Sequence, residues 1–323
     1  MSTREQILAI LEENRGQAVS GQALAGRAGV SRAAVWKAVE ALRQEGHKIG
    51  GATNRGYRLE ADSDVLCRET VLPYVKSPVN LLVEREMDST ITRLRALALE
   101  GAPHGTVALA ERQTAGRGRR GRSFASPPGG VYLGVLLRPA MSAQRAVRLT
   151  VAACVGVCRA MQTVCGLEGG IKWVNDVFLN GRKVCGILTE AATSLESGML
   201  DYAVVGVGVN FRYPEGGFPP ALQEIAGCLY GPGQRPPVSR GQMAAALIDS
   251  LMDCLSKPEA ADIMAEYRAR SMVVGKSVLV LRGEERRPAR AVDVLEDGSL
   301  RVRYADGAFE DLCSGEVSIL PEG

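Results

Sequence analysis

Apolar residues recur at helical spacing over the first sixty positions of the chain. The first group lies on one face of a helix that ends at Gly16, and its members are Ile7, Leu8, Ile10 and Leu11. A short helix is predicted over residues 21–28. The turn Gly29-Val30-Ser31 then supplies an N-cap serine for a third helix that reaches residue 46.

After this helix the apolar period shortens, and residues 47–59 predict a two-stranded hairpin around Asn54-Arg55-Gly56. Helix, turn, helix and hairpin together indicate a winged helix-turn-helix that binds DNA, with the third helix in the major groove. The expected DNA-binding residues are at the start of that helix and in the wing: Ser31, Arg32, Ala33, Trp36, Lys37, Lys48 and Arg55. The alternative for Trp36 is that it caps the small core.

Strands and helices alternate along the middle of the chain. Strands are expected at residues 80–86, 106–110 and 131–137, and helices at 90–99 and 144–164. Asp88-Ser89-Thr90 is expected to cap the first of these helices. Because local hairpins interrupt the alternation, the pattern predicts an α+β domain with a central mixed or antiparallel sheet.

The last part of the chain changes from helical to short alternating patterns after Gly275. Two amphipathic helices, over residues 243–255 and 258–270, close the central domain. Four short strands with Asp-Gly turns follow and predict a small β-barrel. The expected domains are therefore residues 1–61, 66–271 and 274–323.

Composition narrows the class of protein only a little. Of the 323 residues 46% are apolar and 23% are charged, as in ordinary globular proteins, and a net charge of +3 is too small to indicate a nucleic-acid partner by itself. Eight cysteines without a CxxC pair, and two histidines, favour neither a zinc site nor a disulfide framework. The start of the chain has no signal-peptide core, and no stretch reaches 18 apolar residues, so we expect a cytoplasmic protein with no membrane partner.

The most unusual stretch is RQTAGRGRRGRSF, residues 112–124, which we call the arginine loop. Glycine and arginine alternate in it, and this pattern disfavours both a helix and a buried strand. Guanidinium groups and free backbone N–H groups, with no carboxylate nearby in the sequence, are typical of a receptor for a polyanion such as a phosphate chain. The alternative for such a run is a solvated basic loop.

A hairpin with a defined register is predicted where Asn180-Gly181 separates two apolar runs. The register places Leu179 opposite Arg182, Phe178 opposite Lys183, and Asp176 opposite Cys185. Asp176 and Lys183 would then be diagonal neighbours, roughly 7 Å apart, which suits bracketing a ligand better than a direct bond. The alternative is a surface salt bridge across the strands.

Gly206 and Gly208 alternate within the apolar run YAVVGVGVNF, which ends near Asn210. Glycine weakens a strand unless something must approach its face closely, so this stretch is expected to form the floor of a ligand site. Residues 212–240 are rich in proline and glycine and are a candidate lid.

Three motifs in this order behind a winged helix resemble the biotin protein ligase family, in its bifunctional ligase and biotin-operon repressor form, over essentially the whole chain. They are GRGRRGR at residues 116–122, KWVND at 172–176 where the family has KWPND, and GxGxN at 206–210. The resemblance implies an N-terminal winged helix-turn-helix, a central mixed-sheet domain like class II synthetases and a C-terminal SH3-like β-barrel. Departures from the family pattern are Ile91 for asparagine, Val174 for proline and Phe124 for tryptophan.

The resemblance also implies which residues bind the substrates. The expected biotin site is Ser89, Thr90, Ile91, Gln113, Arg117, Gly118, Arg119, Lys183, Gly186, Gly206 and Gly208. The expected ATP site is Arg119, Arg122, Asn175, Asp176, Lys183 and Asn210. Lys183, Arg119 and Asp176 are the expected catalytic residues, and no metal ion is bound by the protein alone.

The implied reaction joins biotin to AMP and then to a lysine of a biotin carboxyl carrier protein, with Mg²⁺ on the phosphates of ATP. The activation step needs cationic charge rather than a side-chain nucleophile. With the adenylate bound, a homodimer would bind operator DNA as a repressor of biotin synthesis genes. The alternatives are a lipoate-type ligase on the same fold, and a ligand-sensing transcription regulator without catalysis.

Overall fold

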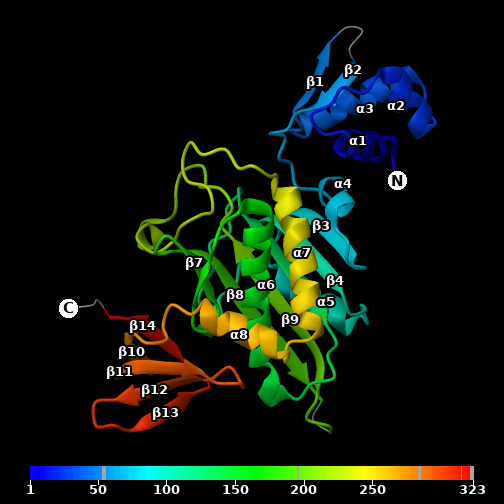
Figure 1. The fold of residues 1–323 in the computed structure, drawn as a ribbon. Coiled ribbons are helices and arrows are strands. Elements are labelled where there is room, and N and C mark those ends of the chain that lie inside the picture. The colour runs from blue at the N-terminus through cyan, green and yellow to red at the C-terminus, as the bar shows by residue number, and fades with distance from the viewer. Residues whose placement is uncertain (53–55, 195, 283–284, 314, 321–323) are drawn as a thin grey trace.

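In the computed structural model, which describes residues 1–52, 56–194, 196–282, 285–313 and 315–320, the chain folds from an N-terminal helical unit into a central sheet and a C-terminal sheet (Figure 1). The first unit contains α1 (Thr3–Glu13), α2 (Gly21–Ala28), α3 (Arg32–Gln44), β1 (Ile49–Ala52) and β2 (Gly56–Leu59). Ser2, Ser20 and Ser31 each accept a backbone N–H with their side chain and so begin the three helices. The strands pair antiparallel, which confirms the predicted winged helix-turn-helix.

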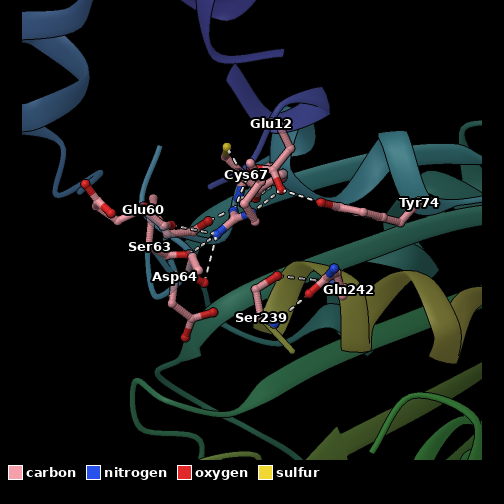
Figure 2. A network of polar contacts seen from close by, with 12 residues as sticks. Glu12, Glu60, Ser63, Asp64, Cys67, Tyr74, Ser239 and Gln242 are labelled. Carbon is pink, nitrogen blue, oxygen red and sulfur yellow. Dashed lines mark hydrogen bonds and ion pairs between the residues drawn. The ribbon is translucent and has the colours of Figure 1, made fainter. Parts of the chain in front are cut away.

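Arg15 joins this unit to the central domain. Figure 2 shows the polar network at this joint, with Glu12, Ser63 and Tyr74 labelled. Glu12 is buried, and its carboxylate accepts Nε and Nη2 of Arg15 at 2.7 and 2.6 Å and the hydroxyl of Tyr74 at 2.8 Å. Arg15 Nη1 also donates to the carbonyl of Ser63 at 2.7 Å. The expected linker after residue 61 is therefore held at both sides rather than loose.

Asp64 continues this attachment into the central domain. Its carboxylate accepts Nε of the buried Arg240 at 2.9 Å, and Nη2 of Arg212 lies 3.4 Å away. Arg240 Nη2 donates to Glu111 at 2.8 Å, so the linker is tied to β4 (Thr106–Gln113) and to the start of α7 (Arg240–Ser256).

The central sheet has the strand order β3-β4-β5-β9-β8-β7-β6. β3 and β4 are parallel and the other neighbours are antiparallel, which confirms the predicted mixed sheet. The strands are β3 (Asn80–Met87), β4 (Thr106–Gln113), β5 (Val131–Leu137), β6 (Gly170–Lys172), β7 (Asp176–Leu179), β8 (Arg182–Thr193) and β9 (Leu200–Val209).

Helices cover both faces of this sheet. The residues Leu109 and Leu133 pack with α6 (Val147–Cys165) and α7 (Arg240–Ser256), whereas the alternate residues Ala108 and Leu136 pack with α5 (Thr90–Leu99). Every residue of β5 is buried, as predicted. The short α4 (Arg68–Val71) and α8 (Ala261–Ala269) lie at the two ends of the helical layer.

Among the described residues, one helical segment is long and apolar enough to span a membrane by length and composition. It is Ala143–Cys165, which consists of α6 and the short 3-10 turn before it. However, 72% of its most apolar window is buried inside the fold, which is the position of a core helix.

The C-terminal sheet has the order β13-β12-β11-β10-β14 and is antiparallel. Its strands are β10 (Ser277–Arg282), β11 (Glu285–Val294), β12 (Leu300–Tyr304), β13 (Phe309–Leu312) and β14 (Glu316–Ile319). The first four match the predicted strands, but β14 was not predicted. Trp173 Nε1 donates to the carbonyl of Gly298 at 3.0 Å and so joins this sheet to the central domain.

Candidate active site

A cavity of about 580 Å³ opens between the arginine loop, the β7–β8 hairpin, the end of β9 and β14. It brings together all residues predicted for the two substrates: Ser89, Thr90, Ile91, Gln113, Arg117, Gly118, Arg119, Arg122, Asn175, Asp176, Lys183, Gly186, Gly206, Gly208 and Asn210. The volume is in the usual range for a small-molecule site. The arrangement of these side chains divides the cavity into an ionic end and an uncharged end.

Asp176 and Lys183 mark the ionic end, and here the predicted spacing was wrong. Lys183 Nζ lies 2.6 Å from Asp176 Oδ1, and both side chains are about one-quarter exposed. The two form a direct ion pair because the flexible lysine stem crosses the distance between the diagonal positions. Apart from this ion pair, the buried Asp176 Oδ1 has no hydrogen-bond partner in the part of the chain that the structure describes.

The hairpin register explains how these two side chains meet. Asn180 and Gly181 both have positive φ, Leu179 pairs with Arg182, and Phe178 pairs with Lys183, as predicted. The register then shifts, and Asp176 faces Gly186 rather than Cys185. The prediction failed at this position because a β-bulge adds one residue to β8.

The arginine loop has carboxylate partners, contrary to prediction. Arg122 donates to both oxygens of Glu316 in β14 at 3.1 and 2.7 Å, and Arg117 Nη2 lies 3.1 Å from Glu190 in β8. Their acidic partners are distant in sequence, so the local pattern did not reveal them. Arg119 instead donates to the amide oxygen of Asn175 at 3.2 Å, and burial lowers the pKa of its guanidinium.

Amides and hydroxyls form the uncharged end. Gln113 accepts the backbone N–H of Thr90 at 2.9 Å and donates to Ser126 Oγ at 2.8 Å. Ser89 Oγ is buried and has no hydrogen-bond partner among the described residues. Ser89 is the N-cap residue of α5 but makes no side-chain cap bond, so the predicted capping is absent and its hydroxyl is available to a ligand.

Gly206 and Gly208, which were expected to form the floor of the ligand site, are covered by side chains of the protein. A Cβ on Gly208 would lie 2.4 Å from Phe124 Cε1, and one on Gly206 would lie 2.5 Å from Ile91 Cδ1. The predicted close approach is therefore real, but in this structure the approaching groups are Phe124 and Ile91 rather than a ligand. Gly186 also contacts the Phe124 ring from β8.

The predicted DNA-binding residues lie apart from this cavity, on the N-terminal unit. Ser31, Arg32, Ala33 and Lys37 are exposed. Trp36 is 56% exposed, so it does not cap the core. Two predicted positions belong to the wing: Lys48 forms an ion pair with Asp62 at 2.7 Å, and Arg55 lies outside the described residues.

Comparison with known proteins assigns the chain to a family. A model described as the biotin/lipoate A/B protein ligase family matches residues 82–210, and one described as an HTH domain matches residues 3–58. The bifunctional ligase/repressor BirA of Bacillus subtilis (strain 168) is 34% identical over 230 residues, which cover 70% of each chain. The chain belongs to the biotin protein ligase family.

Two further members of the biotin protein ligase family extend the match. The bifunctional ligase/repressor BirA of Escherichia coli (strain K12) is 25% identical over 293 residues, covering 88% of this chain and 87% of that one. The solved biotin protein ligase from Aquifex aeolicus in complex with biotin and ATP superposes with a TM-score of 0.61 at 25% identity, covering 75% of this chain and 99% of that one.

Several cavity residues of this biotin protein ligase family member were missed from the sequence. Residues 316–318 reach the cavity from the unpredicted β14, and Gly315 directly precedes that strand, so their absence from the prediction follows from the missed strand. The predicted lid contributes Phe218, Leu222 and residues 224–226. Its proline-rich composition signalled a loop but not which residues face the site.

Proposed function

We propose that this chain is an ATP-dependent biotin protein ligase that forms biotinyl-AMP and transfers the biotinyl group to a lysine of a biotin carboxyl carrier protein. The supporting observation is that one cavity combines cationic groups, near Lys183 and Arg119, with neutral hydrogen-bonding groups, near Thr90 and Gln113. A molecule with a carboxylate at one end and a neutral polar ring at the other matches both ends. Solved relatives were captured with biotin and ATP in their sites.

The first step joins the biotin carboxylate to the α-phosphorus of ATP. A carboxylate oxygen attacks phosphorus, the bond to the β-phosphate oxygen breaks, and pyrophosphate leaves with the electron pair. Negative charge on the phosphate oxygens increases during this step, and Lys183 and Arg119, which line the cavity, would stabilise it. Because no covalent bond to the enzyme forms, the site needs no nucleophilic side chain.

The pocket carboxylate of Asp176 suits Mg²⁺, which prefers oxygen ligands and is usually held by one or two carboxylates together with phosphates. Asp176 lines the cavity, and Mg²⁺ would compete with Lys183, whose Nζ lies 2.6 Å from Oδ1, for this carboxylate. Among the described residues no cluster of three or more acidic, histidine or cysteine side chains could hold a metal ion alone. Mg²⁺, which supplies charge neutralisation, would then arrive with ATP and be shared with Asp176.

In the second step the amine of an acceptor lysine attacks the carbonyl carbon of biotinyl-AMP. An amide bond forms, the lysine nitrogen loses a proton to solvent, and AMP leaves. Water must be excluded from the mixed anhydride until the acceptor arrives. The arginine loop and residues 218–226 border the cavity and are the segments that would cover it.

The N-terminal unit adds a repressor function. The exposed start of α3 presents Arg32, Trp36 and Lys37 on one surface, which suits the major groove of operator DNA. With the adenylate bound, two copies would form a homodimer that matches a two-fold operator in the cytoplasm. Sedimentation with and without biotin and ATP tests this: ligand-dependent dimers are expected, and a monomer under both conditions contradicts it.

The test of the enzyme activity supplies biotin, ATP, Mg²⁺ and a biotin carboxyl carrier domain. We expect pyrophosphate release on adding biotin and a mass increase on one carrier lysine. A parallel reaction with lipoate distinguishes the other acid named in the family description. Labelling with lipoate but not biotin, or no pyrophosphate release with either acid, would reject the proposed function.

A further inference from the structure

Glu190 lies at the end of the row of β8 residues that forms the cavity floor. Gly186 and Leu188 line the cavity and pair with Gly208 and Gly206 in β9. Side chains two residues apart in a strand point to the same face, so Glu190 is the next side chain in this row. It lies toward the uncharged end, because Lys183 is at the opposite end of the same strand.

The Glu190 carboxylate forms an ion pair with Arg117 of the arginine loop. Arg117 Nη2 lies 3.1 Å from Oε1, and Arg117 Nη1 donates to Oε2 at 3.4 Å. Arg95 of α5 donates to the same Oε2 at 3.1 Å. The Glu190 side chain is 23% exposed, so this pair is partly shielded from solvent.

The arginine loop needs such an attachment because its backbone supplies little. Ala115 N–H still donates to Asp88 at 2.8 Å on the body of the domain. From Gly116 onward the bonds run within the loop, from Gly118 to Arg122 at 2.7 Å and from Phe124 to Gly116 at 2.8 Å. Glycines on both sides of Arg117 leave the backbone free to rotate. Side chains therefore decide how far this ribbon lies from the sheet.

We propose that Glu190 is a positioning residue that fastens the arginine loop, through Arg117, over the uncharged end of the cavity and so retains the acyl adenylate until transfer. This inference rests on the proposed ligase function. Arg117 then holds the loop against β8 through its ion pair with Glu190 and does not bind phosphate. Arg119 remains at the ionic end. Glu190 contacts neither reacting atom, so its effect falls on retention rather than on adenylate formation.

The experiment uses the full chain loaded with biotin and ATP, and follows release of pre-formed biotinyl-AMP after a chase with unlabelled biotin. Glu190→Gln keeps the size of the side chain and removes its charge. We expect release to be roughly fivefold faster, the ratio that a partly exposed ion pair worth about 1 kcal/mol supports. The single-turnover rate of pyrophosphate release is expected to stay within about twofold of the parent, because the ionic end is unchanged.

Three variants make the assignment specific. Glu84→Gln removes another carboxylate that faces α5, 3.9 Å from Arg93, and is expected to leave release unchanged. Arg95→Gln keeps the Arg117 contact and is expected to release slowly, like the parent. In an Arg117→Gln background, Glu190→Gln is expected to add nothing further, since its partner is already gone.

Unchanged release in Glu190→Gln would overturn the proposal. So would a full Glu190→Gln effect in the Arg117→Gln background, or an equal effect from Arg95→Gln, because either result places the function elsewhere. If the parent chain forms no adenylate from biotin and ATP, the proposed ligase function fails instead, and that outcome is recognised before any variant is compared.

Discussion

The joint and the arginine loop both use arginine–carboxylate pairs, but in opposite environments. At the joint, Arg15 and Glu12 have side-chain exposures of 12% and 0%, and Tyr74 and the linker carbonyls fill further hydrogen-bonding positions. In the arginine loop, Arg117 and Arg122 are 42% and 67% exposed. Burial makes a pair costly to break, and exposure makes it easy to exchange for another anion.

The difference in burial suggests that the joint contributes to stability and the arginine loop to catalysis. The joint fixes the DNA-binding unit to the central domain, because a buried charge without its partner is strongly unfavourable. Under the proposed function the loop would admit and release substrates, and weak pairs would permit that movement at small cost. Substitutions should therefore change the stability of the protein at the joint and its catalysis at the loop.

The largest effect is expected at the joint. Glu12→Ala leaves Arg15 buried without its carboxylate, and should lower the free energy of unfolding of the N-terminal unit by about 3–5 kcal/mol. Urea unfolding followed by circular dichroism measures it. Glu13→Ala is the matched control, since its pair with Arg27 is about half exposed and should contribute under about 1 kcal/mol. Equal losses for both variants would remove the contrast on which the comparison depends.

At the loop, Arg119→Ala should reduce the single-turnover rate of adenylate formation by roughly 10²–10³-fold, because one donor to the developing phosphate charge is lost. The unfolding midpoint should barely change, since the Arg119 side chain donates to the neutral amide of Asn175 rather than to a carboxylate. Arg112→Ala, which removes an exposed pair with Glu86, serves as the control. A rate within about threefold of the parent, measured by rapid quench, would assign Arg119 no part in the chemistry.

Acid pH should lower the stability of the N-terminal unit, because the buried His47 would have to take up a proton. Burial, together with the charges of Arg15 and Arg4, lowers the His47 pKa from 6.5 to about 4. The unfolded chain then takes up a proton at higher pH than the folded one, so stability is lost as the pH falls from about 6.5 to 4. The loss at the lower limit is about 3 kcal/mol. His47→Gln should flatten this part of the stability profile, and an identical profile for both proteins would contradict the assignment.

The smallest effect is expected from removing one hydrogen bond across the joint, from Tyr74 to Glu12. Tyr74→Phe removes the hydroxyl that donates to Glu12, and should cost about 1.5–3 kcal/mol, as for hydrogen bonds to charged groups. Burial and the nearby Glu12 carboxylate raise the Tyr74 pKa to about 12, so the bond should persist across the neutral range. Differential scanning calorimetry measures the loss. Biotinylation at 25 °C should be unaffected, and a matching fall in activity would indicate that the joint also shapes the site.

Much of the fold could be predicted from the sequence, because helix starts, turns and buried strands depend on local sequence patterns. The helix starts at Ser20 and Ser31, the Asn180-Gly181 turn and the buried strand at residues 131–137 all follow from short-range preferences. The same holds for membership of the cavity, since each motif occupies a strand end or a loop beside one. The bulge in β8 and the strand β14 escaped prediction because neither has a distinct local signature.

The sequence by itself therefore determined the elements, the turn at the hairpin and the set of residues available to the site. Tertiary structure alone decided their partners: Glu190 for Arg117, Glu316 for Arg122, and Tyr74 for Glu12. These pairs join residues that are far apart along the chain, and their strength depends on burial, which no local pattern records. The local sequence determines where charged side chains occur along the chain. The tertiary packing of distant segments determines which of these side chains form pairs.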